Sequence, residues 1–136
     1  MYPADIVMPM KEQLTSNGFE DLTSVEKVDN AMKKEGTTLV MVNSVCGCAA
    51  GAARPGVLLS VTGDNVPDNL TTVFAGFDID ATNRVREYLM PFPPSSPAVA
   101  LFKNGELVHM LERHHIEGHS AEAIAQNLKE AYAEFV

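Results

Sequence analysis

Two cysteines separated by one glycine are the residues of this sequence best suited to chemistry. Cys46 and Cys48 follow an apolar run and precede a segment of small residues, where a strand should end and a helix begin. Free backbone amides and the positive end of the helix dipole stabilise a thiolate there, which makes Cys46 a candidate nucleophile. Gly47 gives the backbone freedom to bring the two sulfurs together. A disulfide across one residue closes a strained, easily reduced ring, so the pair predicts redox chemistry.

Three other interpretations of the cysteines compete with this one. Small buried cysteines often do no more than pack. A zinc site could combine the cysteines with His114, His115 and His119, but Cys-x-Cys is tighter than the usual Cys-x-x-Cys, so we expect no metal. Two thiolates could hold an iron–sulfur cluster only across a dimer or with added thiols. The histidines then form a polar, solvated turn.

Composition narrows the class of protein. The chain has 136 residues, 46% of them hydrophobic, which predicts one domain over residues 1–136. Its 10 basic and 18 acidic residues give a net charge of −8, so we expect no nucleic acid as partner. No apolar run approaches the roughly 20 residues of a membrane span, and the start lacks the features of a signal peptide. We therefore expect a cytoplasmic protein without a membrane partner.

Strands and helices alternate along the chain. Apolar runs predict strands at Thr37–Val42 and Leu70–Ala75, and Asn104-Gly105 predicts a hairpin between strands at Ala98–Phe102 and Leu107–Leu111. Helical spacing and capping residues predict five helices, which cover Met8–Ser16, Thr23–Lys34, Ala49–Val61 with a kink at Pro55, Asp78–Leu89, and a last helix capped by Ser120. This order predicts an α/β fold, a three-layer sandwich with a mixed central sheet flanked by helices.

The segment Val42 to Gly51, with Ala53-Arg54-Pro55 after it, resembles the signature of the bacilliredoxin family, thioredoxin-like proteins with a Cys-Gly-Cys site. The likeness extends over nearly the whole chain through Pro9-Met10, Gly18-Phe19-Glu20, Thr72 to Gly76, Ser95-Ser96-Pro97 and Arg113 to His119. His115 departs from the family, which has an acidic residue there.

The resemblance implies a thioredoxin-like fold and thiol-disulfide exchange linked to bacillithiol. Cys46 would attack a mixed disulfide between bacillithiol and a client protein, and Cys48 would serve as the second thiol. Bacillithiol would be a co-substrate, its disulfides on client proteins the partners, and no cofactor would be bound. General disulfide isomerase or reductase activity is the alternative that also fits such a site.

Three further residues could support the cysteines. Arg54 could hold a thiolate or an anionic thiol such as bacillithiol, which carries a malate carboxylate group, or it could be an ordinary exposed helical arginine. The resemblance implies that Pro97 follows a cis peptide bond opposite Cys46, although most X-Pro bonds are trans. With a cis bond, the backbone of Ser96 could pair with an extended client chain beside Cys46.

Overall fold

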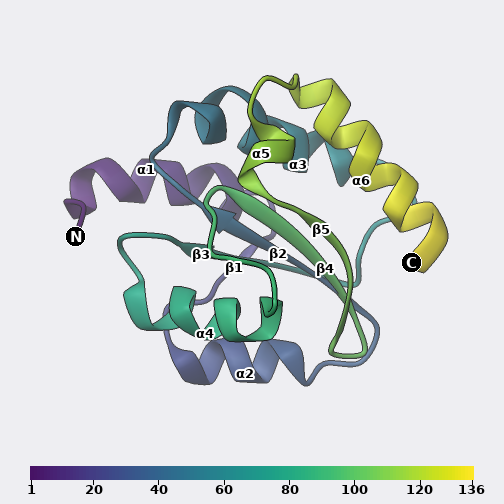
Figure 1. Ribbon diagram of the computed structural model, residues 1–136, viewed down its shortest axis with the longest axis horizontal. Coiled ribbons are helices and arrows are strands. Elements are labelled where there is room, and N and C mark those ends of the chain that lie inside the picture. Colours follow the sequence, from purple (N-terminus) through teal and green to yellow (C-terminus); the bar gives the residue numbers. More distant parts are fainter.

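The computed structural model describes residues 1–136, with helices on both faces of a five-stranded sheet (Figure 1). The strands lie in the order β1 (Glu20–Asp21), β3 (Asn69–Phe74), β2 (Thr37–Asn43), β4 (Ala98–Lys103) and β5 (Glu106–Leu111). One face carries α1 (Ala4–Thr15), α3 (Arg54–Ser60) and α6 (Ala121–Phe135), and the other carries α2 (Val25–Met32) and α4 (Ile79–Leu89). A short helix, α5 (Arg113–Ile116), follows β5. The predicted three-layer α/β sandwich with a mixed sheet is confirmed.

Strand β2 is the centre of the sheet, and all seven of its residues are buried. Side chains alternate between the two faces of a strand. Leu39 and Met41 accordingly pack with residues of α1, α3 and α6, whereas Val40 and Val42 pack with residues of α2 and α4. A nearly continuous apolar run thus fills two cores at once, which is typical of a strand covered on both faces.

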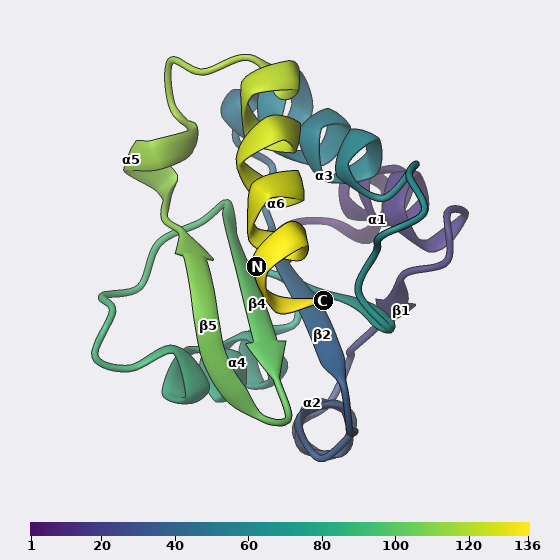
Figure 2. The same ribbon diagram turned by 90° about the vertical axis from the view of Figure 1, so that its right-hand side faces the viewer.

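The strand directions bring three chain segments to one edge of the sheet. Strand β2 pairs parallel with β3 and antiparallel with β4, and β4 pairs antiparallel with β5. The predicted hairpin is confirmed, and its turn residues Asn104 and Gly105 have φ of 51° and 82°. The start of β4 and the end of β5 therefore lie at the carboxyl end of β2, as Figure 2 shows.

The helix after the cysteines differs from its prediction. A π-helical segment, Ala49–Ala53, leads into α3, and Pro55 lies in the first turn of α3 rather than at a kink inside a longer helix. Proline fits a first turn because its missing amide hydrogen needs no partner there. The irregularity lies instead in the preceding segment of small residues.

Other differences concern short elements and helix ends. Helix α1 begins at Ala4 instead of Met8 and contains Pro9 in its interior. The cap of α2 is Ser24, which accepts a hydrogen bond from the Lys27 amide, instead of Thr23. Strand β1 and helix α5 were not predicted, since elements of two and four residues are too short for a periodic pattern. None of the helices has the length and apolar composition that a membrane crossing requires.

Candidate active site

Cys46 lies where the chain leaves the sheet and begins to coil. Its carbonyl oxygen accepts hydrogen bonds from the amides of Ala49 (2.9 Å) and Ala50 (3.3 Å), the first bonds of the following helical segment. Its own amide donates to Ser44 Oγ at 3.1 Å. Cys46 is therefore held at the amino end of a helical segment, at the carboxyl end of the central strand. This is the edge at which open α/β sheets place their sites.

The two sulfur atoms lie side by side. Cys46 Sγ and Cys48 Sγ are 2.6 Å apart, both residues are half-buried, and both are free thiols. The backbone amide of Cys48 also points at Cys46 Sγ, at 3.4 Å. Either sulfur could be the donor in the sulfur–sulfur contact, but the amide makes Cys46 the better acceptor, and hence the better place for a negative charge.

The surroundings shift the pKa values of the two thiols in opposite directions. Hydrogen bonds from the Cys48 thiol and amide lower the pKa of Cys46, and the positive charge of Arg113 adds to this effect. Burial raises the pKa of Cys48, and so does the neighbouring Cys46. Cys48 therefore holds its proton more firmly than Cys46, which makes Cys46 the candidate nucleophile and Cys48 the candidate second thiol.

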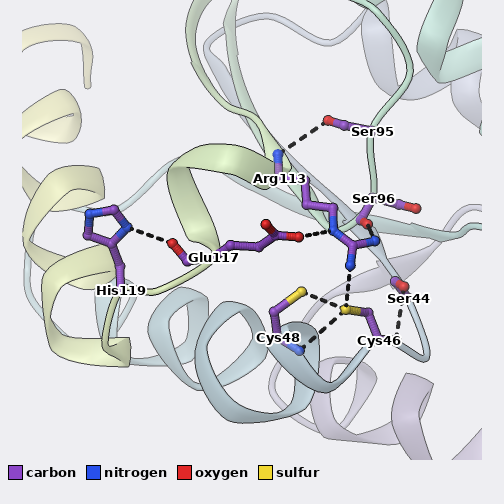
Figure 3. A network of polar contacts seen from close by, with 8 residues as sticks. All are labelled: Ser44, Cys46, Cys48, Ser95, Ser96, Arg113, Glu117 and His119. Carbon is purple, nitrogen blue, oxygen red and sulfur yellow. Dashed lines mark hydrogen bonds and ion pairs between the residues drawn. The ribbon is translucent and has the colours of Figure 1, made fainter.

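Arg113 is a site residue that the sequence interpretation missed. Its Nη2 donates to Cys46 Sγ at 3.2 Å and its Nη1 to the carbonyl oxygen of Ser96 at 3.2 Å, as Figure 3 shows. Its Nε pairs with the carboxylate of Glu117, one helical turn further on. Arg113 lies 67 residues from Cys46 in sequence, so no local spacing links the two. Its place within the Arg113–His119 segment of the family resemblance was the one available signal.

The register of the sheet explains why Arg113 reaches the cysteines. Val42 near the end of β2 pairs with Ala98 at the start of β4, and Val99 pairs with Leu111 at the end of β5. Arg113 comes two residues after Leu111, and the Arg113 amide contacts Ser95 Oγ at 3.4 Å. The loop before β4 and the turn after β5 therefore meet beside Cys46.

Arg54 fits neither of the two roles considered for it. It is only 2% exposed, so the interpretation as an exposed helical arginine is wrong, and it makes no hydrogen bond to either sulfur. Its Nη1 donates to Asn43 Oδ1 (3.0 Å) and to the Ser44 carbonyl oxygen (2.8 Å), and its Nε donates to Gln13. Arg54 thus holds the segment that connects β2 to Cys46.

Gly47 does not need its conformational freedom in this dithiol form. Its φ lies outside the left-handed region, and a Cβ added there would meet no atom within 4 Å. The same space is open at Gly51. Added Cβ atoms at Gly47 and Gly51 would therefore meet only chain neighbours, and the space that the small residues should leave for a bulky partner stays a prediction.

Pro97 and Ser96 lie at the same edge as the cysteines. The Ser96–Pro97 bond is cis, as expected, and so is Met90–Pro91, for which no expectation was made. Arg113 connects Ser96 to Cys46 by donating to both, so the Ser96 backbone lies beside the thiols. The Ser96 carbonyl oxygen already accepts one hydrogen bond from Arg113 and has a second lone pair for another donor.

The histidines do not join the cysteines. His109, His114, His115 and His119 line a groove of about 420 Å³ between β5 and the helices α5 and α6. His114, His115 and Glu112 lie close enough to share an ion, but His115 Nδ1 is already bonded to the Glu112 amide, and neither cysteine belongs to this group. The structure therefore does not assemble the zinc site of cysteines and histidines considered from the sequence.

Sequence comparison finds similar proteins over almost the full chain. A family model described as "Disulphide isomerase" matches residues 2–136. A curated relative named "Bacilliredoxin" from Cytophaga hutchinsonii is 57% identical over 98% of this chain and 99% of its own. A second bacilliredoxin, from Halalkalibacterium halodurans, is 52% identical over 98% of this chain and 93% of its own.

Solved structures of thioredoxins show the same fold at low sequence identity. Mitochondrial thioredoxin 3 from Saccharomyces cerevisiae superposes with a TM-score of 0.60 at 14% identity, over 90% of this chain and 99% of its own. The thioredoxin of Plasmodium falciparum gives 0.59 at 19% identity, over 85% of this chain and 98% of its own. The predicted thioredoxin-like fold is confirmed.

Proposed function

Because this chain belongs to the bacilliredoxin family and is a thiol oxidoreductase, we propose that it removes bacillithiol from mixed disulfides on client proteins. The observation that carries the proposal is the unequal pair of thiols. Cys46 accepts hydrogen bonds from the Cys48 amide and from Arg113, while Cys48 keeps its proton. We propose the cytoplasm as the compartment, since a reducing environment keeps this pair as thiols.

The first step is attack by the Cys46 thiolate on the bacillithiol sulfur of the client's mixed disulfide. A new sulfur–sulfur bond joins Cys46 to bacillithiol, the old bond breaks, and the client cysteine leaves as a thiolate that takes up a proton. The bond electrons go to the client, which is thereby reduced. Cys46 is only half-buried and the adjacent Gly47 is exposed, which supports access of a mixed disulfide to Cys46.

The second step returns Cys46 to the thiolate. A second bacillithiol thiolate attacks the bacillithiol sulfur on Cys46, which forms bacillithiol disulfide and releases Cys46. In a competing route, Cys48 attacks Cys46 Sγ, expels bacillithiol and closes the Cys46–Cys48 disulfide. Two external thiols then reduce this disulfide and leave as a disulfide of their own. The sulfur separation of 2.6 Å supports the competing route, and the raised pKa of Cys48 slows it at neutral pH.

Intact mass spectrometry tests the proposal. Cys48→Ala and Cys46→Ala proteins are incubated with a model protein that carries bacillithiol on its single cysteine. We expect Cys48→Ala to gain the mass of bacillithiol while the client is released as a free thiol, and Cys46→Ala to gain nothing. If neither variant takes up bacillithiol and the client stays modified, the proposal is wrong.

General disulfide isomerase or reductase activity is the second candidate, favoured by the description of the matching family model. The same reactive Cys46 would attack a disulfide between two protein cysteines, and the Ser96 backbone would pair with the substrate chain. Wild-type protein that refolds a scrambled disulfide substrate but leaves the bacillithiol-modified client intact would favour this candidate. Refolding of the scrambled substrate and release of bacillithiol from the client are measured on the same protein preparation, so a difference between them separates the two functions.

A further inference from the structure

Arg113 is the one charged side chain that donates a hydrogen bond to the nucleophilic sulfur. It approaches Cys46 Sγ with Nη2, while Nε is taken by Glu117 and Nη1 by the Ser96 carbonyl oxygen. The Arg113 backbone amide donates to Ser95 Oγ, so both the backbone and the side chain of Arg113 are anchored (Figure 3). About 45% of the side chain is exposed, and the guanidinium is open to a ligand from solvent.

Exchange removes the negative charge that Arg113 faces. When Cys46 carries a small thiol in a mixed disulfide, its sulfur is neutral and a poor hydrogen-bond acceptor. The contacts to Glu117 and Ser96 do not depend on that charge, so they keep the guanidinium beside the sulfur. Nη2 then lacks an anionic partner, and it faces the small-thiol group that is bonded to Cys46 Sγ.

We propose that Arg113 binds a carboxylate of the small thiol carried on Cys46, and so selects anionic over neutral thiols. This inference deepens the proposed function and rests on it for the identity of the thiol as a carboxylate-bearing one. Glu117 occupies Nε and the Ser96 carbonyl oxygen occupies one N–H of Nη1, so Nη2 and the second N–H of Nη1 remain to face the two oxygens of a carboxylate. The chain has a net charge of −8 and would otherwise repel such a thiol.

Arg113, and not Arg54, is therefore the arginine that can hold an anionic thiol at Cys46. Arg54 is 2% exposed and its hydrogen bonds go to Gln13, Asn43 and Ser44, so a ligand has no access to it. Arg113 is exposed and touches the reacting sulfur. The other basic side chains make no hydrogen bond to either cysteine.

The test measures how firmly Cys46 holds two small thiols that differ in charge. In a Cys48→Ala background, Cys46 is equilibrated with mixtures of mercaptosuccinate and 2-mercaptoethanol and their disulfides, and intact mass gives the ratio of the two adducts. Arg113→Gln is compared with the parent, so that intrinsic differences between the thiols cancel. We expect Arg113→Gln to reduce the preference for mercaptosuccinate about fivefold, the size of an ion pair at an exposed site.

Two control variants separate local recognition from general electrostatics. Lys129→Gln lowers the net charge by the same amount on the exposed surface of α6, and it should leave the preference unchanged. Arg113→Lys keeps the charge and loses the planar fork, so it should retain part of the preference. Added salt should weaken the preference of the parent protein and not that of Arg113→Gln.

The outcomes distinguish this inference from the proposed function. An equal adduct ratio in the parent and Arg113→Gln proteins overturns the inference, because stabilisation of the thiolate alone shifts the equilibria of both adducts by the same factor and leaves their ratio unchanged. A different result would show that the proposed function is wrong: the wild-type protein would not release bacillithiol from the client, whatever the adduct ratio on Cys46. The adduct ratio needs no client, so each result is read by itself.

Discussion

Removal of the Cys48 thiol should make Cys46 less reactive at neutral pH. Three donors face Cys46 Sγ in the reduced protein: the Cys48 thiol at 2.6 Å, Arg113 Nη2 at 3.2 Å and the Cys48 amide at 3.4 Å. Cys48→Ala removes the first and keeps the other two, since alanine retains the amide. The pKa of Cys46 is lowered chiefly by the Cys48 side chain, so in the variant it should rise.

The size of this effect has a ceiling. A cysteine with an unperturbed pKa near 8.5 is only about 3% ionised at pH 7, so losing all three donors could reduce the thiolate fraction by at most about thirtyfold. Losing one of three should reduce it roughly three- to tenfold. A thiolate of higher pKa is more nucleophilic, with a Brønsted coefficient of about 0.4–0.5, which offsets nearly half of the loss on a logarithmic scale. We therefore expect alkylation of Cys46 at pH 7 to slow by about two- to fourfold.

The pH profile makes the reasoning specific. Pulses of iodoacetamide between pH 6 and pH 10, followed by mass spectrometry of the Cys46 peptide, give the alkylation rate at that residue alone. The variant should react more slowly than wild type at neutral pH and faster near pH 10. At that pH Cys46 is ionised in both proteins, so the basicity of its thiolate decides the rate. Cys48→Ser, which keeps a hydroxyl donor, should lie between the two. A variant that matches the wild-type rate and midpoint would refute a donor role for the Cys48 thiol.

Three further outcomes follow from other contacts. Arg113→Gln should make the reduction potential of the Cys46–Cys48 pair more negative in a glutathione redox titration, by about 30 mV for each tenfold loss of thiolate stabilisation, and an unchanged potential would contradict the contact at Cys46. Lys11→Met should cost about 3 kcal/mol in urea unfolding, because buried Lys11 pairs with Asp21 and Asp78, whereas Lys11→Met combined with Asp78→Asn should recover part of the loss. Burial raises the pKa of Tyr132 to about 12, so the neutral phenol favours the folded state. This contribution to the free energy of unfolding is fully present below about pH 10, and roughly 3 kcal/mol of it should be lost towards pH 12. The Tyr132→Phe protein should lack this loss in unfolding measured against pH.

Features that depend on neighbouring residues could be predicted from the sequence. The run at Thr37–Val42 predicts a strand covered on both faces because its apolar residues are continuous, and Asn104-Gly105 predicts a hairpin because both residues tolerate positive φ. The position of Cys46 between strand and helix follows from the same local patterns. Local signals thus supply the nucleophile and most of the elements that place it.

Features that depend on the order of the strands could not be predicted. Arg113 meets Cys46 only because β4 lies between β2 and β5, and a sequence with no known strand order does not place it there. The burial of Arg54 has a similar origin, since its partners Gln13 and Asn43 come from α1 and the end of β2. A polar side chain looks the same in sequence whether its partners are water or the buried end of a strand.

The contacts also bear on which of the two routes resets Cys46. Three causes raise the pKa of Cys48 in the reduced protein: burial first, then the hydrogen bond with Cys46 and the charge of Cys46. A mixed disulfide on Cys46 cancels the charge but leaves the burial, which still raises the pKa of Cys48 and slows its attack although its sulfur is close to Cys46. A small thiol from solvent is not itself buried, and it can reach Cys46 because Cys46 is only half-buried and Gly47 beside it is exposed. Within the proposed cycle, the arrangement therefore supports transfer of the small thiol to a second one over closure of the internal disulfide.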